Sequence, residues 1–147
     1  MQGLLPSDPQ QMGDYRLTGR LGSGGMGNVY LARELRLDRD VALKVIRSEL
    51  AADDRFRARF REESRTAASI EHPRVVTVFG AGERDGLLYV AMRYVAGRDL
   101  GKLISARGAL PALNVRRHFL QFIPRGRRPA IAILSKQVGS VEKHTGV

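Results

Sequence analysis

Three glycines early in the chain have a spacing that is typical of loops that hold phosphate. Gly22, Gly24 and Gly27 form G-x-G-x-x-G, and Val29 follows two residues later. Glycine lets the backbone take positive φ angles and approach a ligand closely, because it has no Cβ. Backbone N–H groups can then point at phosphate oxygens. We therefore expect an anion-binding loop formed by Leu21, Gly22, Ser23, Gly24, Gly25, Met26, Gly27, Asn28 and Val29.

The residues on either side of the glycines decide which class of loop this is. A dinucleotide-binding turn shares the spacing, but it needs a helix that begins at the glycines. Here Val29 and Leu31 alternate as in a strand, and Tyr15, Leu17 and Leu21 alternate before the loop. The loop therefore joins two antiparallel strands, which excludes a dinucleotide-binding turn.

Lys44 is a candidate partner for a phosphate. It is the only lysine before Lys102, and it lies in the otherwise apolar run of residues 41–46. Both faces of such a strand are apolar, so both should be covered. A buried ammonium needs a counter-charge or a phosphate. The alternative is an edge-strand lysine that reaches water, but the glycine loop nearby favours the phosphate.

Glu63 interrupts the apolar stripe of an expected helix. Asp53 or Asp54 can cap this helix, and its apolar positions are Phe56, Phe60, Ala67 and Ile70. Position 63 is the missing step of that stripe, so we expect the Glu63 carboxylate to point inward. A buried carboxylate requires a partner. The alternative is a solvated Glu63 at the border of the stripe.

The glycine loop and the run V-A-L-K at residues 41–44 together resemble the amino-terminal lobe of a bacterial-type serine/threonine protein kinase. The resemblance covers about residues 14–112. It implies an α+β small lobe, with a five-stranded antiparallel sheet and one main helix, over residues 14–92. A hinge and a short helix of the second lobe would follow over residues 93–112. We place the strands at residues 15–21, 28–33, 40–47, 75–79 and 87–92, with a turn over residues 80–86.

The resemblance also implies ATP as the ligand and gives each site residue a role. Glu63 pairs with Lys44 and holds its ammonium at the α- and β-phosphates. Ala42 covers one face of the purine, with Leu21 and Val29 above it, and Met92 closes the back of the pocket. The adenine edge meets backbone groups of the hinge residues Arg93, Tyr94 and Val95. The family usually has an acidic residue where this chain has Arg93.

The second half of the kinase signature is missing. None of His72, His118 and His144 begins an H-R-D motif, and the 147 residues contain no D-F-G or A-P-E. In the family, the aspartates of these motifs accept the substrate hydroxyl proton and bind the magnesium of MgATP. We expect a transferase fragment that binds ATP weakly, has no metal ligands and is catalytically inactive by itself. A truncated or frame-shifted kinase, or a damaged gene, would explain this.

Length and composition limit the other possibilities. A chain of 147 residues has room for one domain, and it contains no cysteine for disulfides or thiolate metal sites. Residues 1–13 lack the pattern of a signal peptide and read as a flexible leader. No apolar run is long enough for a membrane span. These observations favour a cytoplasmic protein, and a protein substrate is implied only for the intact family.

The net charge of +10 is concentrated in a tail that resembles no family. Residues 113–147 form this tail, and residues 111–147 carry seven basic residues and one glutamate, a net charge of +6. Two alternative functions follow. The exposed face of a lone lobe could recruit partners or self-associate, or the basic tail could bind nucleic acid. The second ranks last, because no aromatic stacking platform accompanies the basic residues.

Overall fold

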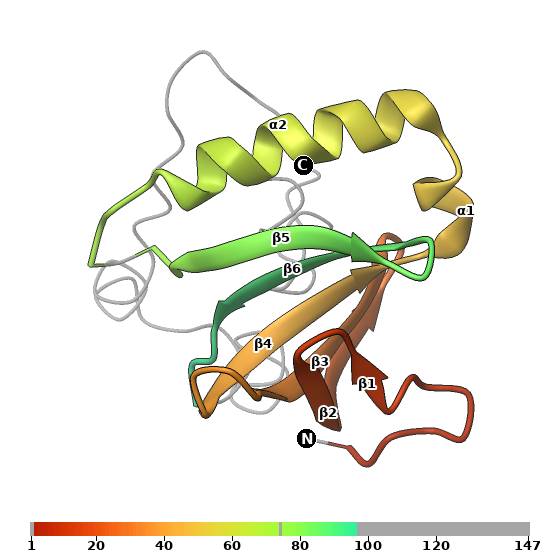
Figure 1. The fold of residues 1–147 in the computed structure, drawn as a ribbon, viewed down its shortest axis with the longest axis vertical. Coiled ribbons are helices and arrows are strands. Elements are labelled where there is room, and N and C mark those ends of the chain that lie inside the picture. The colour runs from red at the N-terminus through yellow and green to blue at the C-terminus, as the bar shows by residue number, and fades with distance from the viewer. Residues whose placement is uncertain (1, 74, 97–147) are drawn as a thin grey trace, which may run out of the picture.

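The computed structural model describes residues 2–73 and 75–96, which form one curled antiparallel sheet with two helices (Figure 1). The strand order is β1-β2-β3-β4-β6-β5. The elements are β1 (Gln11–Met12), β2 (Tyr15–Gly24), β3 (Gly27–Glu34), β4 (Arg39–Ile46), α1 (Ser48–Ala51), α2 (Asp54–Ala68), β5 (Val78–Arg84) and β6 (Leu87–Arg93). This confirms the expected α+β small lobe. The short helix of the second lobe and the tail over residues 113–147 lie outside the described residues.

The central strand β4 is buried on both faces, as its sequence predicted. Its side chains alternate between two apolar clusters, one facing α2 and one on the opposite face of the sheet. The first contains Ala42, Ile46, Ala51, Phe56, Phe60, Ala67, Val78, Leu88, Val90 and Met92. The second contains Met12, Leu17, Tyr30, Ala32, Val41, Leu43, Val45 and Ala91. Lys44 is therefore held inside the sheet, only 3% exposed.

One strand was predicted in the wrong place. We expected a strand over residues 75–79 and a turn over 80–86, whereas β5 runs Val78–Arg84. The turn is confined to Asp85 and Gly86, which have φ angles of 51° and 76°, typical of a two-residue hairpin loop. Because β5 is an edge strand, it tolerates the charged Glu83 and Arg84, whose sequence had suggested a loop.

Residues 2–13 also differ from the flexible leader that we expected over residues 1–13. Met12 is buried in the second cluster, and β1 pairs with the start of β2. Gln2 and Arg20 exchange two backbone hydrogen bonds, of 3.0 and 2.8 Å. The leader, of which residues 2–13 are described, therefore packs against β2 and supplies the sixth strand of the sheet.

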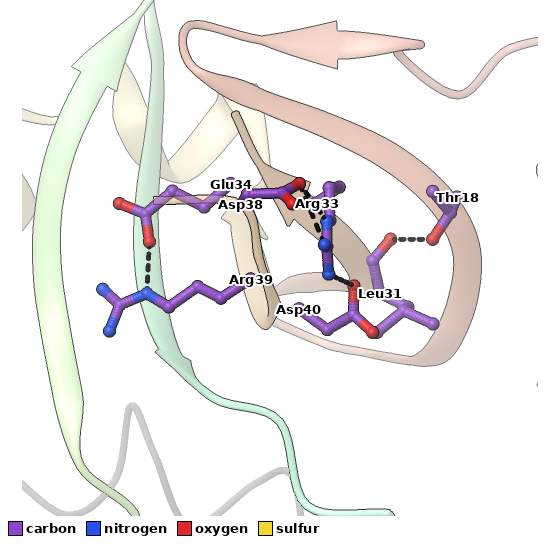
Figure 2. A network of polar contacts seen from close by, with 7 residues as sticks. All are labelled: Thr18, Leu31, Arg33, Glu34, Asp38, Arg39 and Asp40. Carbon is purple, nitrogen blue, oxygen red and sulfur yellow. Dashed lines mark hydrogen bonds and ion pairs between the residues drawn. The ribbon is translucent and has the colours of Figure 1, made fainter. Parts of the chain in front are cut away.

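Charged side chains join β3 to β4 at their connecting turn (Figure 2). Arg33 contacts Asp38 at 2.9 Å and Asp40 at 3.1 Å, and Arg39 donates to Glu34. The Arg39 guanidinium also lies 3.7 Å from the ring centroid of Phe79. The Arg33 pairs are exposed and contribute little alone, whereas Glu34 is buried. All of them join the two strands of the hairpin whose second strand carries Lys44.

In the part of the chain that the structure describes, no helix combines the length and the apolar character that crossing a membrane requires.

Candidate functional site

The glycine loop is the end of the β2–β3 hairpin, which confirms the antiparallel connection predicted from its flanks. The register of the two strands shifts twice, so that Thr18 and Leu21 are extra residues in β2. Such bulges bend a strand and increase its twist. Leu21, at the second bulge, packs against the cluster on the α2 face. The hairpin thus places Leu21 on the same face of the sheet as Val29, which is the face that α2 covers.

The glycines of the loop are needed for different reasons. Gly27 has a φ of +153°, and a Cβ there would lie 2.0 Å from the Val45 carbonyl oxygen. The fold itself therefore requires glycine at this position. A Cβ added at Gly22, Gly24 or Gly25 would meet nothing within 4 Å, and these residues have no positive φ. Neither backbone conformation nor packing within the described chain explains these three glycines.

The strand register places the predicted nucleotide-contacting side chains on one face. Val29 is opposite Lys44, and Ala42 is opposite Met92. Directly paired residues of adjacent strands share a face, and this is the face that α2 covers. Ala42 and Met92 belong to one apolar cluster there, and Leu21 and Val29 pack against it. The structure therefore brings together the apolar residues that the sequence assigned to the purine, next to the buried Lys44.

Helix α2 places Glu63 toward the sheet. The helix begins after Asp53, whose carboxylate accepts hydrogen bonds from the N–H groups of Arg55 (2.8 Å) and Phe56 (3.3 Å). The Glu63 side chain is only 8% exposed, and it shares its buried stripe with the phenylalanines of the helix. This confirms the inward orientation and excludes a solvated Glu63.

Glu63 has a charged neighbour that the sequence analysis missed. Arg59 lies one turn earlier, with its Nε 3.7 Å from the Glu63 carboxylate. Burial raises the pKa of Glu63, and the charge of Arg59 partly opposes this shift. The i, i+4 spacing of the two residues was a signal that could have found this pair. The ion pair between Glu63 and Lys44 stays a prediction.

Two of the predicted contact residues are more restricted than expected. The N–H of Arg93 donates to the Thr77 carbonyl at 2.9 Å, so this N–H is already engaged within the fold. The Asn28 side chain donates to the Tyr30 hydroxyl at 3.2 Å. Because Tyr30 belongs to the second cluster, the Asn28 side chain points away from the face of Lys44. Asn28 can therefore serve a ligand on that face only through its backbone.

A cavity of about 290 Å³ lies between α2 and β5. It contains none of the residues that the sequence assigned to the site. Its walls include Phe60, Ser64 and Ala68 of the helix and Ala81, Gly82 and Leu88 of the sheet.

Within residues 2–73 and 75–96, no three His, Cys, Asp or Glu side chains are placed to hold a metal ion.

Comparison with known proteins decides the family. The sequence profile described as the protein kinase domain matches residues 15–125. The chain belongs to the protein kinase domain family. This match ends thirteen residues beyond the limit of about 112 that we expected, so it continues into the region that we had assigned to a tail of no family.

The relatives of this kinase-domain chain are bacterial serine/threonine kinases. It is 43% identical over 106 residues to serine/threonine-protein kinase PrkC of Bacillus subtilis, covering 70% of the chain and 16% of PrkC. It is 48% identical over 93 residues to PknF of Mycobacterium tuberculosis, covering 63% of the chain and 20% of PknF. The chain thus spans a fifth or less of the length of these relatives.

A solved structure supports the same assignment. The PknI kinase domain of Mycobacterium tuberculosis superposes with a TM-score of 0.65 at 38% sequence identity, covering 76% of this chain and 46% of that domain. This likeness confirms the kinase small lobe as the fold of the described residues.

Proposed function

We propose that this chain binds ATP between the glycine loop and the α2 face of its sheet. The observation that carries the proposal is the contrast among the loop glycines. Gly22 and Gly24 are required neither by φ nor by packing within the described chain, so the close approach that they permit is available to a ligand. They lie on the strand next to Val29, which is opposite the buried Lys44.

The residues around this position match what ATP needs. Backbone N–H groups of the loop and the Lys44 ammonium supply positive charge for phosphates. Leu21, Val29, Ala42 and Met92 supply an apolar surface for the purine, and backbone groups of residues 93–95 supply hydrogen bonds. Glu63 would pair with Lys44 and orient its ammonium group, and Arg59 would compete with Lys44 for the Glu63 carboxylate.

Phosphoryl transfer from ATP to serine or threonine of a protein substrate is the activity that we propose for the whole kinase. The 147 residues contain none of the motifs whose aspartates bind magnesium and accept the substrate proton. We therefore expect nucleotide binding from this chain by itself, and no phosphoryl transfer.

A thermal-shift titration with MgATP tests the proposal. Ligand that binds only the folded state raises the midpoint of unfolding by mass action. We expect stabilisation by millimolar MgATP that is lost in Lys44→Met. Arg47→Met, which removes an exposed positive charge just after β4, is the control and should keep the shift. For each variant, the midpoint of unfolding with MgATP is compared with the midpoint of the same variant without MgATP. A change in the variant's own stability therefore does not affect the result. No shift of the natural sequence at millimolar ATP would contradict the proposal.

A further inference from the structure

We propose that the leader positions the glycine loop, with Asp8 acting on the loop through the Tyr30 hydroxyl. This inference rests on the proposed function in one respect, because it assigns the positioned loop to ATP. The leader precedes the part of the chain that matches the kinase family, which begins at residue 15.

Asp8 is buried and fully engaged. One carboxylate oxygen accepts a hydrogen bond from the Tyr30 hydroxyl at 2.8 Å, and the other accepts one from the Leu5 N–H at 2.8 Å. Arg20 lies 3.9 Å away. Burial raises the pKa of Asp8, but these two hydrogen bonds and the Arg20 charge outweigh it and lower the pKa below its usual value. A buried carboxylate with this set of partners is held in one position.

Tyr30 connects Asp8 to the loop. Its side chain is only 2% exposed, and a buried phenol hydroxyl needs partners. Besides donating to Asp8, this hydroxyl accepts a hydrogen bond from the Asn28 side chain at 3.2 Å. Asn28 lies in the glycine loop, opposite Ser23 and next to Gly27. The three side chains therefore form a continuous path from the leader to the loop.

The leader also holds the other strand of the hairpin. The two backbone hydrogen bonds between Gln2 and Arg20 fix β2 just before the bulge at Leu21. The leader thus contacts β2 and β3 close to the loop, at the edge of the sheet opposite β5 (Figure 1). The Asn28–Tyr30 contact is on the sheet face away from Lys44, so this contact does not occupy the Lys44 side of the loop. Fixing a loop before its ligand arrives lowers the entropy cost of binding.

Hydrogen exchange of the nucleotide-free protein tests the anchoring directly. Asp8→Ala and Tyr30→Phe should raise exchange of the amides of residues 22–28 several-fold and leave β6 unchanged. In the double variant these amides should exchange only slightly faster than in Tyr30→Phe, because both changes remove the hydrogen bond between Tyr30 and Asp8. Asp8→Asn keeps an acceptor for Tyr30 and should restore protection. Tyr15→Phe, at the opposite end of β2 from the loop, is the matched control and should exchange like the natural sequence.

The MgATP thermal shift then tests the link to the ligand. We expect Tyr30→Phe and Asp8→Ala to bind MgATP about threefold to tenfold more weakly, with Tyr15→Phe unchanged. Unchanged loop exchange, or an equal increase across β6, would overturn the anchoring and show that these residues serve overall stability only. Loosened loops with unchanged ATP affinity would overturn the positioning role. If the natural sequence fails to bind ATP, the proposed function fails, and the exchange result alone decides the anchoring.

Discussion

At the scale of single residues, the loop separates glycines that the fold needs from glycines that a ligand would need. Gly27 approaches the Val45 carbonyl too closely for any side chain. Gly24 has open space around it. The same motif therefore contains a structural position and a binding position, which substitutions can distinguish.

Gly27→Ala should destabilise the protein by about 2 kcal/mol or more, because strained φ angles alone cost roughly 1–3 kcal/mol and the added methyl group meets backbone. Gly24→Ala should change the free energy of unfolding by less than about 0.5 kcal/mol. Urea denaturation measures both changes. Gly24→Ala should nevertheless reduce the shift with MgATP, and equal losses of stability in the two variants would contradict this division.

The raised pKa of Glu63 predicts a dependence of stability on pH. Since burial favours the protonated carboxyl, the folded state binds more protons than the unfolded state between the ordinary pKa and the raised one. The free energy of unfolding should therefore fall as pH rises through that window. Glu63→Gln removes the titrating carboxyl and with it this fall in stability. The free energy of unfolding of Glu63→Gln, relative to that of the natural sequence, should therefore increase as pH rises through the same window.

Denaturation at several pH values measures this difference. Glu62→Gln changes the exposed neighbouring carboxylate and serves as the control, with a profile close to that of the natural sequence. Parallel profiles for Glu63→Gln and the natural sequence would show that Glu63 keeps its ordinary pKa in the fold.

At the scale of elements, the sequence predicted those parts whose apolar pattern is regular. Helix α2 was predictable from its capping residue Asp53 and its stripe of phenylalanines. Strand β4 was predictable from the unbroken apolar run around Lys44. Strand β5 was not, because only its first two residues, Val78 and Phe79, are large and apolar, and the glycines, alanine and charged residues that follow show no such pattern. The bulges at Thr18 and Leu21 were not predictable either, because register depends on the partner strand.

Asp53→Ala should lower the free energy of unfolding by about 1 kcal/mol, because it removes the side-chain acceptor for two N–H groups at the start of α2. Thermal or chemical denaturation measures the loss. Asp54→Ala is the matched control, since Asp54 is the next acidic residue and lies in the first turn without serving as the cap. A loss as large in the control would mean that charge near the helix terminus, rather than capping, carries the effect.

At the scale of the whole molecule, the core begins before the part that matches the kinase family. Leu4 and Met12 of the leader pack against the second cluster, although the family match starts at residue 15. The sequence did not reveal this, because Met12 is a lone apolar residue among glutamine, glycine and aspartate. Residues 2–13 are therefore part of what holds the sheet in shape.

Met12→Ala should destabilise the protein by about 2–5 kcal/mol, as truncation of a buried methionine does, because only 3% of Met12 is exposed. Leu5→Ala, at a leader position that is 47% exposed, should change stability by less than about 0.5 kcal/mol. Urea denaturation of both variants measures the difference. Equal, small changes would show that the leader does not contribute to the core.

The two extra residues of β2 have a consequence for how this strand tolerates changes in length. Leu17 and Arg20 both pair with residues of the Tyr30 face, and Gly22 pairs with a residue of the Val29 face. The extra residue Thr18 inverts the odd–even alternation of side chains between the two faces of the sheet. The extra residue Leu21 inverts it a second time and so restores the original alternation. Loss of Thr18 or Leu21 alone would move the side chains at one end of the strand to the opposite face of the sheet. Loss of both residues would keep every side chain at the two ends on its present face. Viable length variants of this hairpin should therefore differ by even numbers of residues.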